Sequence, residues 1–300
     1  MTPLKHRLSP FAANSRASAR ARATYLFALA AAALSLSACD GGTGSIAFHT
    51  WGEDYIEDEI PASDFEDGWQ VTYDTFLVNI GHVRVAASDG TLGAEMTGTL
   101  LFNHAVPGQK PVITFDDLPA GPWEKVSYEV PAVTETTTLA DGVTEAEKAT
   151  MLAQGTSMRV VGTATKAGVE KTFDWSFLRS TLYDDCQGDR DGKLVQGALV
   201  TNGGTDQIQL TIHGDHLFYD DLQSENAVLR FDPIAAADTD ADGAVTLEEL
   251  SQIKLFTLDA GPYGTGSADG IDDLAAFVTA LSQTVGHFRG EGECFGRPID

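Results

Sequence analysis

Short runs of apolar and polar residues in partial alternation fill the middle of the chain, from about residue 68 to residue 218. β-Branched and aromatic residues dominate these runs, and Gly, Pro and Asn separate them. Such runs predict β-strands joined by turns. We expect strands over residues 69–78, 100–102, 111–115, 125–130, 157–164, 171–177, 198–200 and 207–212. Many short strands of this kind predict a mainly β fold, an antiparallel β-sandwich.

Two turn signals and one helix signal interrupt the strands. Residues 118–122 are rich in Pro and Gly and predict the turn that joins strands 111–115 and 125–130. Residues 202–204, Asn-Gly-Gly, predict a hairpin that joins strands 198–200 and 207–212. Thr144 and Glu147 have the spacing of a capping box, so a helix is expected from Thr144 to a stop at Gly155.

The pattern becomes helical after about residue 224. Pro233 favours a short helix, because the first helical position needs no N–H donor. Leu247, Leu250 and Ile253 recur on one helical face and predict a second helix, and residues 273–285 predict a third. We therefore expect a β-sandwich domain over residues 46–223, followed by a small α-helical module over residues 224–300.

Between the first two of these helices, residues 238–249 carry acidic side chains at a regular spacing. Three aspartates alternate with small residues, Gly243 follows them, and a glutamate closes the segment. Calcium prefers six to eight oxygen ligands in a flexible cage, and this spacing supplies them. The expected ligands are Asp238, Asp240, Asp242, Ala244, Thr246 and Glu249. Ala244 would contribute its backbone carbonyl, and Thr246 would act through water.

This segment resembles the EF-hand calcium loop at its diagnostic positions. A solvated turn rich in Asp and Gly is the alternative, but such a turn does not require a glutamate at Glu249. EF-hand loops usually pair, and residues 265–273 keep Asp269, Gly270 and an aliphatic Ile271 without a closing glutamate. The resemblance therefore implies an EF-hand-like module with a degenerate second half.

The first 38 residues have the layout of a secretory signal. Five basic residues and no acidic residue precede an apolar run over 25–34 that is too short to span a membrane comfortably. Residues 36–39, Leu-Ser-Ala-Cys, resemble the lipobox of bacterial lipoproteins, which implies cleavage before Cys39 and diacylation of Cys39. An ordinary cleaved signal is the alternative. We expect a lipid-anchored protein of the cell envelope with a tether over 39–45, on either the inner or the outer membrane.

Removal of the signal makes the chain strongly acidic. It leaves 14 Lys and Arg residues against 44 Asp and Glu residues, a net charge of −30. Such a surface attracts cations and repels nucleic acid and anionic lipid. Export also places Cys186 and Cys294 in an oxidising compartment, where a disulfide between them is expected and two free thiols are the alternative.

A second candidate metal site consists of His213, Asp215 and His216. Imidazole and carboxylate together suit zinc or copper. On a regular strand, side chains three residues apart point to opposite faces, so His213 and His216 should diverge. They could meet only if the strand bends there, with His287 or His82 joining them. Structural histidines at the end of a strand are the alternative.

No nucleophile elbow, phosphate-binding glycine loop or zinc-protease helix occurs in the sequence, so we do not expect an enzyme. The expected function is calcium binding by residues 238–249, structural or as a weak sensor, in an envelope lipoprotein. Two alternatives stay open. One is copper or zinc handling through the histidines, and the other is an envelope enzyme whose active site the sequence does not reveal.

Overall fold

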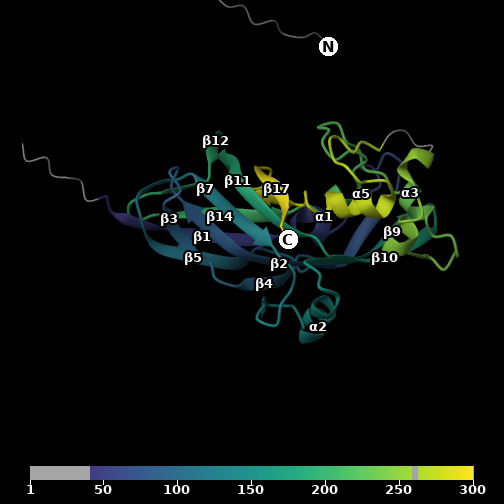
Figure 1. Ribbon diagram of the computed structural model, residues 1–300, viewed down its shortest axis with the longest axis horizontal. Coiled ribbons are helices and arrows are strands. Elements are labelled where there is room, and N and C mark those ends of the chain that lie inside the picture. The colour runs from purple at the N-terminus through teal and green to yellow at the C-terminus, as the bar shows by residue number, and fades with distance from the viewer. Residues whose placement is uncertain (1–40, 259–262, 300) are drawn as a thin grey trace, which may run out of the picture. The chain divides into compact units, whose positions relative to one another are not determined.

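Two curled β-sheets build most of the molecule in the computed structural model, which describes residues 41–258 and 263–299 (Figure 1). The smaller sheet has the strand order β16-β14-β1-β5. Its strands are β1 (Thr43–Trp51), β5 (Lys110–Pro119), β14 (Thr205–Ile212) and β16 (Gly286–Phe288). The expectation of a mainly β fold is confirmed. The expected signal peptide, Cys39 and Asp40 lie outside the described residues.

The larger sheet is organised around one long strand, β2 (Gln70–Ala86), which pairs with four others. Its main path is β12-β11-β7-β2-β9-β10-β15. These strands are β7 (Lys125–Val130), β9 (Met158–Lys166), β10 (Val169–Phe177), β11 (Ser180–Arg190), β12 (Lys193–Gln196) and β15 (Ala244–Val245). Branches are β3 (Leu92–Glu95), β4 (Thr99–Asn103), β8 (Thr138–Leu139) and β17 (Glu293–Ile299). A separate pair joins β6 (Gly121–Trp123) to β13 (Ala198–Val200).

One hydrophobic core connects the two sheets. Ile46 and Phe48 of β1 belong to the same buried cluster as Phe76 and Val78 of β2 and Trp175 of β10. Each fully buried apolar side chain contributes roughly 1.5–3 kcal/mol. The inward-facing alternation that predicted the strands is therefore the pattern that holds the two sheets together.

The strand pairing differs from a purely antiparallel arrangement. β1 pairs with β14 in parallel, as do β4 with β8 and β10 with β15. The expected hairpin at residues 202–204 is wrong, because β13 pairs with β6, while β14 lies between β1 and β16. β1 was not expected and begins at Thr43, inside the segment expected to be a tether.

Short helices complete the fold. The expected helix after Thr144 is confirmed as α2 (Glu145–Gln154), with a full capping box and Gly155 in the left-handed conformation at φ +68°. The others are α1 (Glu53–Glu57), η1 (Asp215–Phe218), α3 (Asp232–Ala235), α4 (Leu247–Leu250), η2 (Leu255–Thr257) and α5 (Leu274–Leu281). Figure 1 shows α3 and α5 near β9 and β10, with α2 on another side. None of the described helices has the length and apolar character to cross a membrane.

The expected EF-hand helical module is not formed by the described residues. The helices on either side of the acidic loop, α3 and α4, are only four residues long, and α4 ends at Leu250, before Ile253. Val245 does not pair with Ile271. It pairs instead with Phe173 on the edge of the larger sheet, where the indole N–H of Trp175 donates to the Val245 carbonyl at 2.8 Å. In a paired EF-hand, Val245 would form these backbone hydrogen bonds with the second calcium loop. Here it pairs with the edge of the larger sheet instead.

Candidate metal centres

Three histidines from separate segments converge at one end of the smaller sheet. His213 follows β14, His216 lies in η1, and His287 lies in β16. Each offers one ring nitrogen, and these three atoms lie within 4.8 Å of one another. The rings of His213 and His287 stack with centroids 4.0 Å apart, and those of His216 and His287 are 4.8 Å apart.

The end of β14 explains this convergence. Thr211 pairs with His287, so His213, two residues later, lies on the same face as His287. β14 then stops at Ile212, and η1 turns the chain so that His216 returns to the other two. The prediction that His213 and His216 diverge was wrong, because it assumed that the strand continues past Ile212.

Two glycines allow the close approach of these segments. A Cβ atom on Gly214 would lie 2.6 Å from Ile56 Cγ1, and one on Gly286 would lie 2.5 Å from the hydroxyl oxygen of Tyr128. Both distances are far shorter than van der Waals contact. Glycine is therefore required on both sides of the histidine cluster.

The cluster is buried and incompletely hydrogen-bonded. His213 and His287 are 7% and 6% exposed. Within the described part of the chain, His213 Nε2 and His287 Nδ1 have no hydrogen-bond partner, whereas His216 Nδ1 lies 3.0 Å from the Thr284 hydroxyl. Buried polar atoms are nearly always satisfied by protein, water or an ion. The free nitrogens are thus available as ligands.

Burial keeps two of the rings neutral. It lowers the pKa of His216 to about 4, and it lowers the pKa of His287 to about 2 with help from the neighbouring His213 and His216. Burial also lowers the pKa of His213, but the Glu53 carboxylate, whose Oε1 is 3.4 Å from His213 Nε2, offsets this and leaves the pKa raised. A neutral imidazole is the form that binds a metal ion.

A cleft of about 640 Å³ leads to His216 and His287. Its lining also contains four carboxylates, Asp221, Glu225, Glu291 and Glu293. No Lys or Arg occurs among the described residues that line it. A cleft with charges of one sign concentrates ions of the other sign, so this one attracts cations.

Two carboxylates that the sequence did not connect with the histidines lie beside them. Glu53, His213 and Glu291 form a second group whose ligand atoms lie within 4.8 Å of one another. Glu53 follows β1, and Glu291 precedes β17. No local pattern links these residues to His213, so only the folded structure identifies them.

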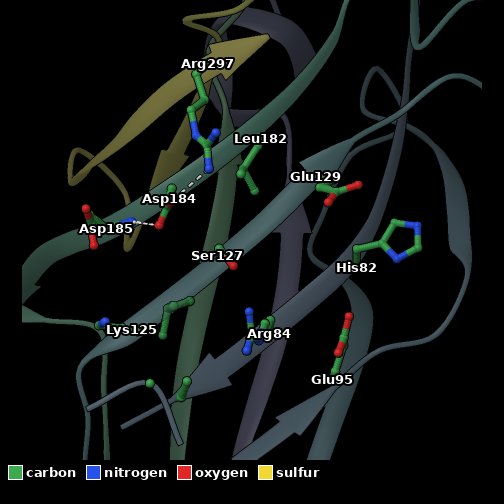
Figure 2. A pocket seen from close by; sticks show the side chains of 13 residues that line it. His82, Arg84, Glu95, Lys125, Ser127, Glu129, Leu182, Asp184, Asp185 and Arg297 are labelled. Atoms are coloured by element: carbon green, nitrogen blue, oxygen red, sulfur yellow. Dashed lines mark hydrogen bonds and ion pairs between the residues drawn. The ribbon is translucent and has the colours of Figure 1, made fainter. Parts of the chain in front are cut away.

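Asp215 and His82 are candidate ligands by sequence, but neither joins the three histidines. Asp215 Oδ2 accepts a hydrogen bond from the Tyr219 hydroxyl at 2.7 Å, and Asp215 lines a different cleft together with Tyr55 and Asp64. His82 lies in a cleft of about 480 Å³ on the larger sheet (Figure 2).

The cleft in Figure 2 has mixed charge. Its labelled side chains include the bases Arg84, Lys125 and Arg297 and the acids Glu95, Glu129, Asp184 and Asp185. One base and one acid already pair there, with Arg297 Nη2 3.5 Å from Asp184 Oδ2. This balance favours neither a cation nor an anion, in contrast to the cleft at the histidines.

The acidic loop brings together three of its six expected ligands. Asp238, Asp240 and Glu249 each offer a carboxylate oxygen within 4.8 Å of the others. The Asp238 side chain is fully buried, and its Oδ2 accepts hydrogen bonds from Lys171 Nζ and, at 3.0 Å, from the Gly243 N–H. The Lys171 contact is the main reason that the pKa of Asp238 is lowered. Asp238 Oδ1 is buried and has no partner in the described residues.

The remaining expected ligands have other local roles. Asp242 Oδ1 accepts from the Ala244 N–H at 2.7 Å, and Asp242 lies outside the group of three carboxylates. Thr246 caps α4 in a capping box with Glu249. Gly243 has φ +89°, the conformation that made glycine the expected residue there. Calcium ligation by all six expected residues stays a prediction.

The expected disulfide between Cys186 and Cys294 is present and joins β11 to β17. Cys294 also lines the cleft that leads to the histidines. The bond therefore fixes the strand that follows Glu291 to the larger sheet.

Comparison with known proteins gives no family. No family model matches the chain, and no curated protein matches its sequence. Among solved structures, MbnP from Methylosinus trichosporium is similar to 59% of this chain and 77% of its own chain, with 9% identity and a TM-score of 0.32. A similarity of this size supports no conclusion about function.

Proposed function

We propose that this protein binds a transition metal ion, copper or zinc, through His213, His216 and His287. One observation carries the proposal. Three imidazoles, two from the end of β14 and the adjoining η1 and one from β16, place their ligand nitrogens within 4.8 Å, and two buried nitrogens of these rings have no partner in the described structure. Imidazole is a common ligand of both metals.

The geometry suits a compact metal centre. Zinc–nitrogen bonds of about 2.0–2.1 Å in a tetrahedral site separate the ligand atoms by roughly 3.4 Å. The histidine nitrogens, at most 4.8 Å apart, reach that spacing by shifts on the order of 1 Å.

The setting of the proposed centre is a β-sandwich outside the cytoplasm, held at a membrane by lipidated Cys39. The net charge of −30 raises the local concentration of cations around it. On this proposal the protein stores or delivers a metal ion and is not an enzyme.

Metal titration of the mature protein tests the proposal. Wild-type protein should take up one equivalent of zinc or copper(II), and His287→Phe should weaken that binding at least about 100-fold by removing a ligand. His49→Gln is the matched control, because His49 lies on β1 outside the cluster. Stoichiometric binding that survives His287→Phe contradicts the proposal.

A second candidate function is calcium binding by residues 238–249. The observation that favours it is the buried, unpartnered Oδ1 of Asp238, close to carboxylate oxygens of Asp240 and Glu249. A cation bound there would satisfy this oxygen. Extracellular modules of this kind bind calcium at about 10⁻⁴–10⁻³ M, which fits a structural ion or a weak sensor.

Thermal unfolding with and without calcium tests this second function. At calcium concentrations 10- to 100-fold above the dissociation constant, binding should stabilise the protein by roughly 1.5–3 kcal/mol. Glu249→Gln should remove the increment, whereas Glu248→Gln, at an exposed neighbouring position, should keep it. Equal melting temperatures for wild type in calcium and in chelator would rule the calcium function out.

A further inference from the structure

We infer that Glu53 and Glu291 complete the histidine centre as carboxylate ligands and make it selective for divalent ions over monovalent copper. The two carboxylates share His213 with the histidine cluster, and their ligand atoms lie within 4.8 Å of one another and of His213. This inference rests on the proposed function of the histidines. It specifies in addition that the ion they bind is divalent.

The backbone places Glu53 beside His213 at an energetic cost. Glu53 has φ +52°, a conformation that is unfavourable for a residue with a side chain. Its neighbour Gly52 is equally constrained, because a Cβ atom there would lie 2.6 Å from the carbonyl oxygen of His104. Strain of this kind accumulates at functional sites, where the surrounding structure maintains it.

The resulting contact is longer than a normal hydrogen bond. Glu53 Oε1 lies 3.4 Å from His213 Nε2, and Nε2 has no hydrogen-bond partner among the described residues. This distance equals the separation of roughly 3.4 Å between two ligand atoms of one tetrahedral metal ion, which would lie to the side of the line that joins them. A metal ion bound to both would satisfy the nitrogen and the carboxylate together.

A hydrogen-bonded turn after β16 presents Glu291. Arg289 and Gly290 have φ +56° and +78°, and the Phe288 N–H donates to the Gly292 carbonyl at 2.8 Å. The Thr211 hydroxyl ties Gly290 to β14 at 2.7 Å. Glu291 is exposed in the wall of the acidic cleft, so its side chain can receive an ion that enters there.

The ligand set explains the expected selectivity. Monovalent copper prefers thiolate and thioether ligands, whereas imidazole with carboxylate suits divalent ions. Cys186 and Cys294 form a disulfide, and no methionine is among the described residues that line the cleft at the histidines. Two carboxylates also attract a doubly charged ion about twice as strongly as a singly charged ion.

The test compares zinc(II), copper(II) and chelator-buffered copper(I) on the mature wild-type protein and on Glu53→Gln, Glu291→Gln and the double variant. Each glutamine should weaken the divalent ions about 10- to 100-fold and change copper(I) affinity less than about threefold. The d–d absorption band of bound copper(II) should shift in Glu53→Gln, because an oxygen donor is lost. Glu225→Gln, which removes a charge from the same cleft, is the matched control.

The outcomes separate the inference from the proposed function. If the wild type binds none of the three ions, the proposed function fails. If binding depends on His287 while both glutamine variants keep divalent affinity, or if copper(I) weakens as much as zinc, only the inference fails. Glu291 is exposed, so Glu291→Gln tests the inference even if Glu53→Gln does not fold.

Discussion

The histidine centre and the acidic loop are built in opposite ways. The loop takes all its expected ligands from twelve consecutive residues, 238–249, and its turn is set locally by Gly243 and by the cap at Thr246. The histidine centre draws on the end of β14, on η1 and on β16, which come together only after the smaller sheet has formed. The acidic loop can therefore be recognised from consecutive residues, whereas the histidine centre forms only when the strands pair.

The two regions also differ in how far protein groups satisfy the hydrogen-bonding and charge requirements of their ligand atoms when no metal is bound. In the loop, Lys171 supplies a positive charge to Asp238, and backbone N–H groups occupy further carboxylate oxygens. In the histidine centre, His213 Nε2 and His287 Nδ1 remain without partners in the described residues. An internal cation thus competes for the loop, whereas no described residue competes in this way for the buried imidazoles.

Replacing one ligand from each region should have the largest effect. His213→Phe should weaken zinc or copper(II) at least about 100-fold and leave calcium binding unchanged, because the two ligand groups share no residue. Asp238→Asn should do the reverse. Calorimetric titration with each ion measures both. A substitution that weakens both ions equally would show that the regions are not independent.

Removing the disulfide should have the next largest effect, on the stability of the fold and on transition-metal affinity. The bond closes a loop between residues 108 positions apart, so Cys186→Ser with Cys294→Ser should destabilise the fold by about 5 kcal/mol in the chain-entropy view. Because β17 follows Glu291 closely, transition-metal affinity should fall as well. Denaturant unfolding measures the first effect. Reductant should reproduce both changes in wild type and neither in the double variant.

A buried histidine outside the cluster tests whether burial alone creates a metal site. Burial lowers the pKa of His104 to about 3, below the 6.5 of the unfolded chain. The unfolded state therefore takes up a proton first as the pH falls, and stability is lost between pH 6.5 and 3. This residue should cost about 2 kcal/mol at pH 5 relative to pH 7.

His104→Gln should flatten that part of the pH–stability curve in denaturant unfolding without changing metal affinity. The glutamine amide can replace the contact between His104 Nε2 and the Thr50 hydroxyl, which are 2.8 Å apart. An unchanged acid sensitivity in the variant, or a loss of zinc binding, would contradict this assignment.

The smallest expected effect concerns Lys171, whose ammonium group pairs with Asp238 of the acidic loop. Lys171→Met should raise calcium affinity a few-fold, because the ion no longer competes with an ammonium group for Asp238. Lys166→Met, which removes a lysine paired with Asp232 at 2.6 Å, is the matched control. Calcium titration decides the matter, and an unchanged or lower affinity in Lys171→Met would count against competition.

The sequence predicted what depends on neighbouring residues. The capping box of α2, the positive φ of Gly243 and five of the eleven strands of the larger sheet (β2, β4, β7, β9 and β10) follow from local pattern. Strand partners could not be predicted from local pattern, because the partner of each strand edge depends on contacts between residues far apart in the sequence. β14 therefore pairs with β1 and β16, and Val245 pairs with β10.

Only part of the histidine centre could be predicted from the sequence, for the same reason. His213 and His216 are neighbours in sequence, but their meeting depends on where β14 stops, and the approach of His287 depends on the register Thr211 to His287. Glu53 and Glu291 stand next to no recognisable motif. A ligand set assembled from several strand ends requires the structure.

The early start of β1 has a consequence for orientation at a membrane. Only four peptide units separate Cys39 from Thr43, a reach of at most about 14 Å, so a diacylated Cys39 would keep that end of β1 close to the lipid headgroups. The strand then runs for nine residues, roughly 30 Å, before Gly52 and Glu53. The proposed metal centre would thus lie up to about 30 Å along the chain from the anchored end.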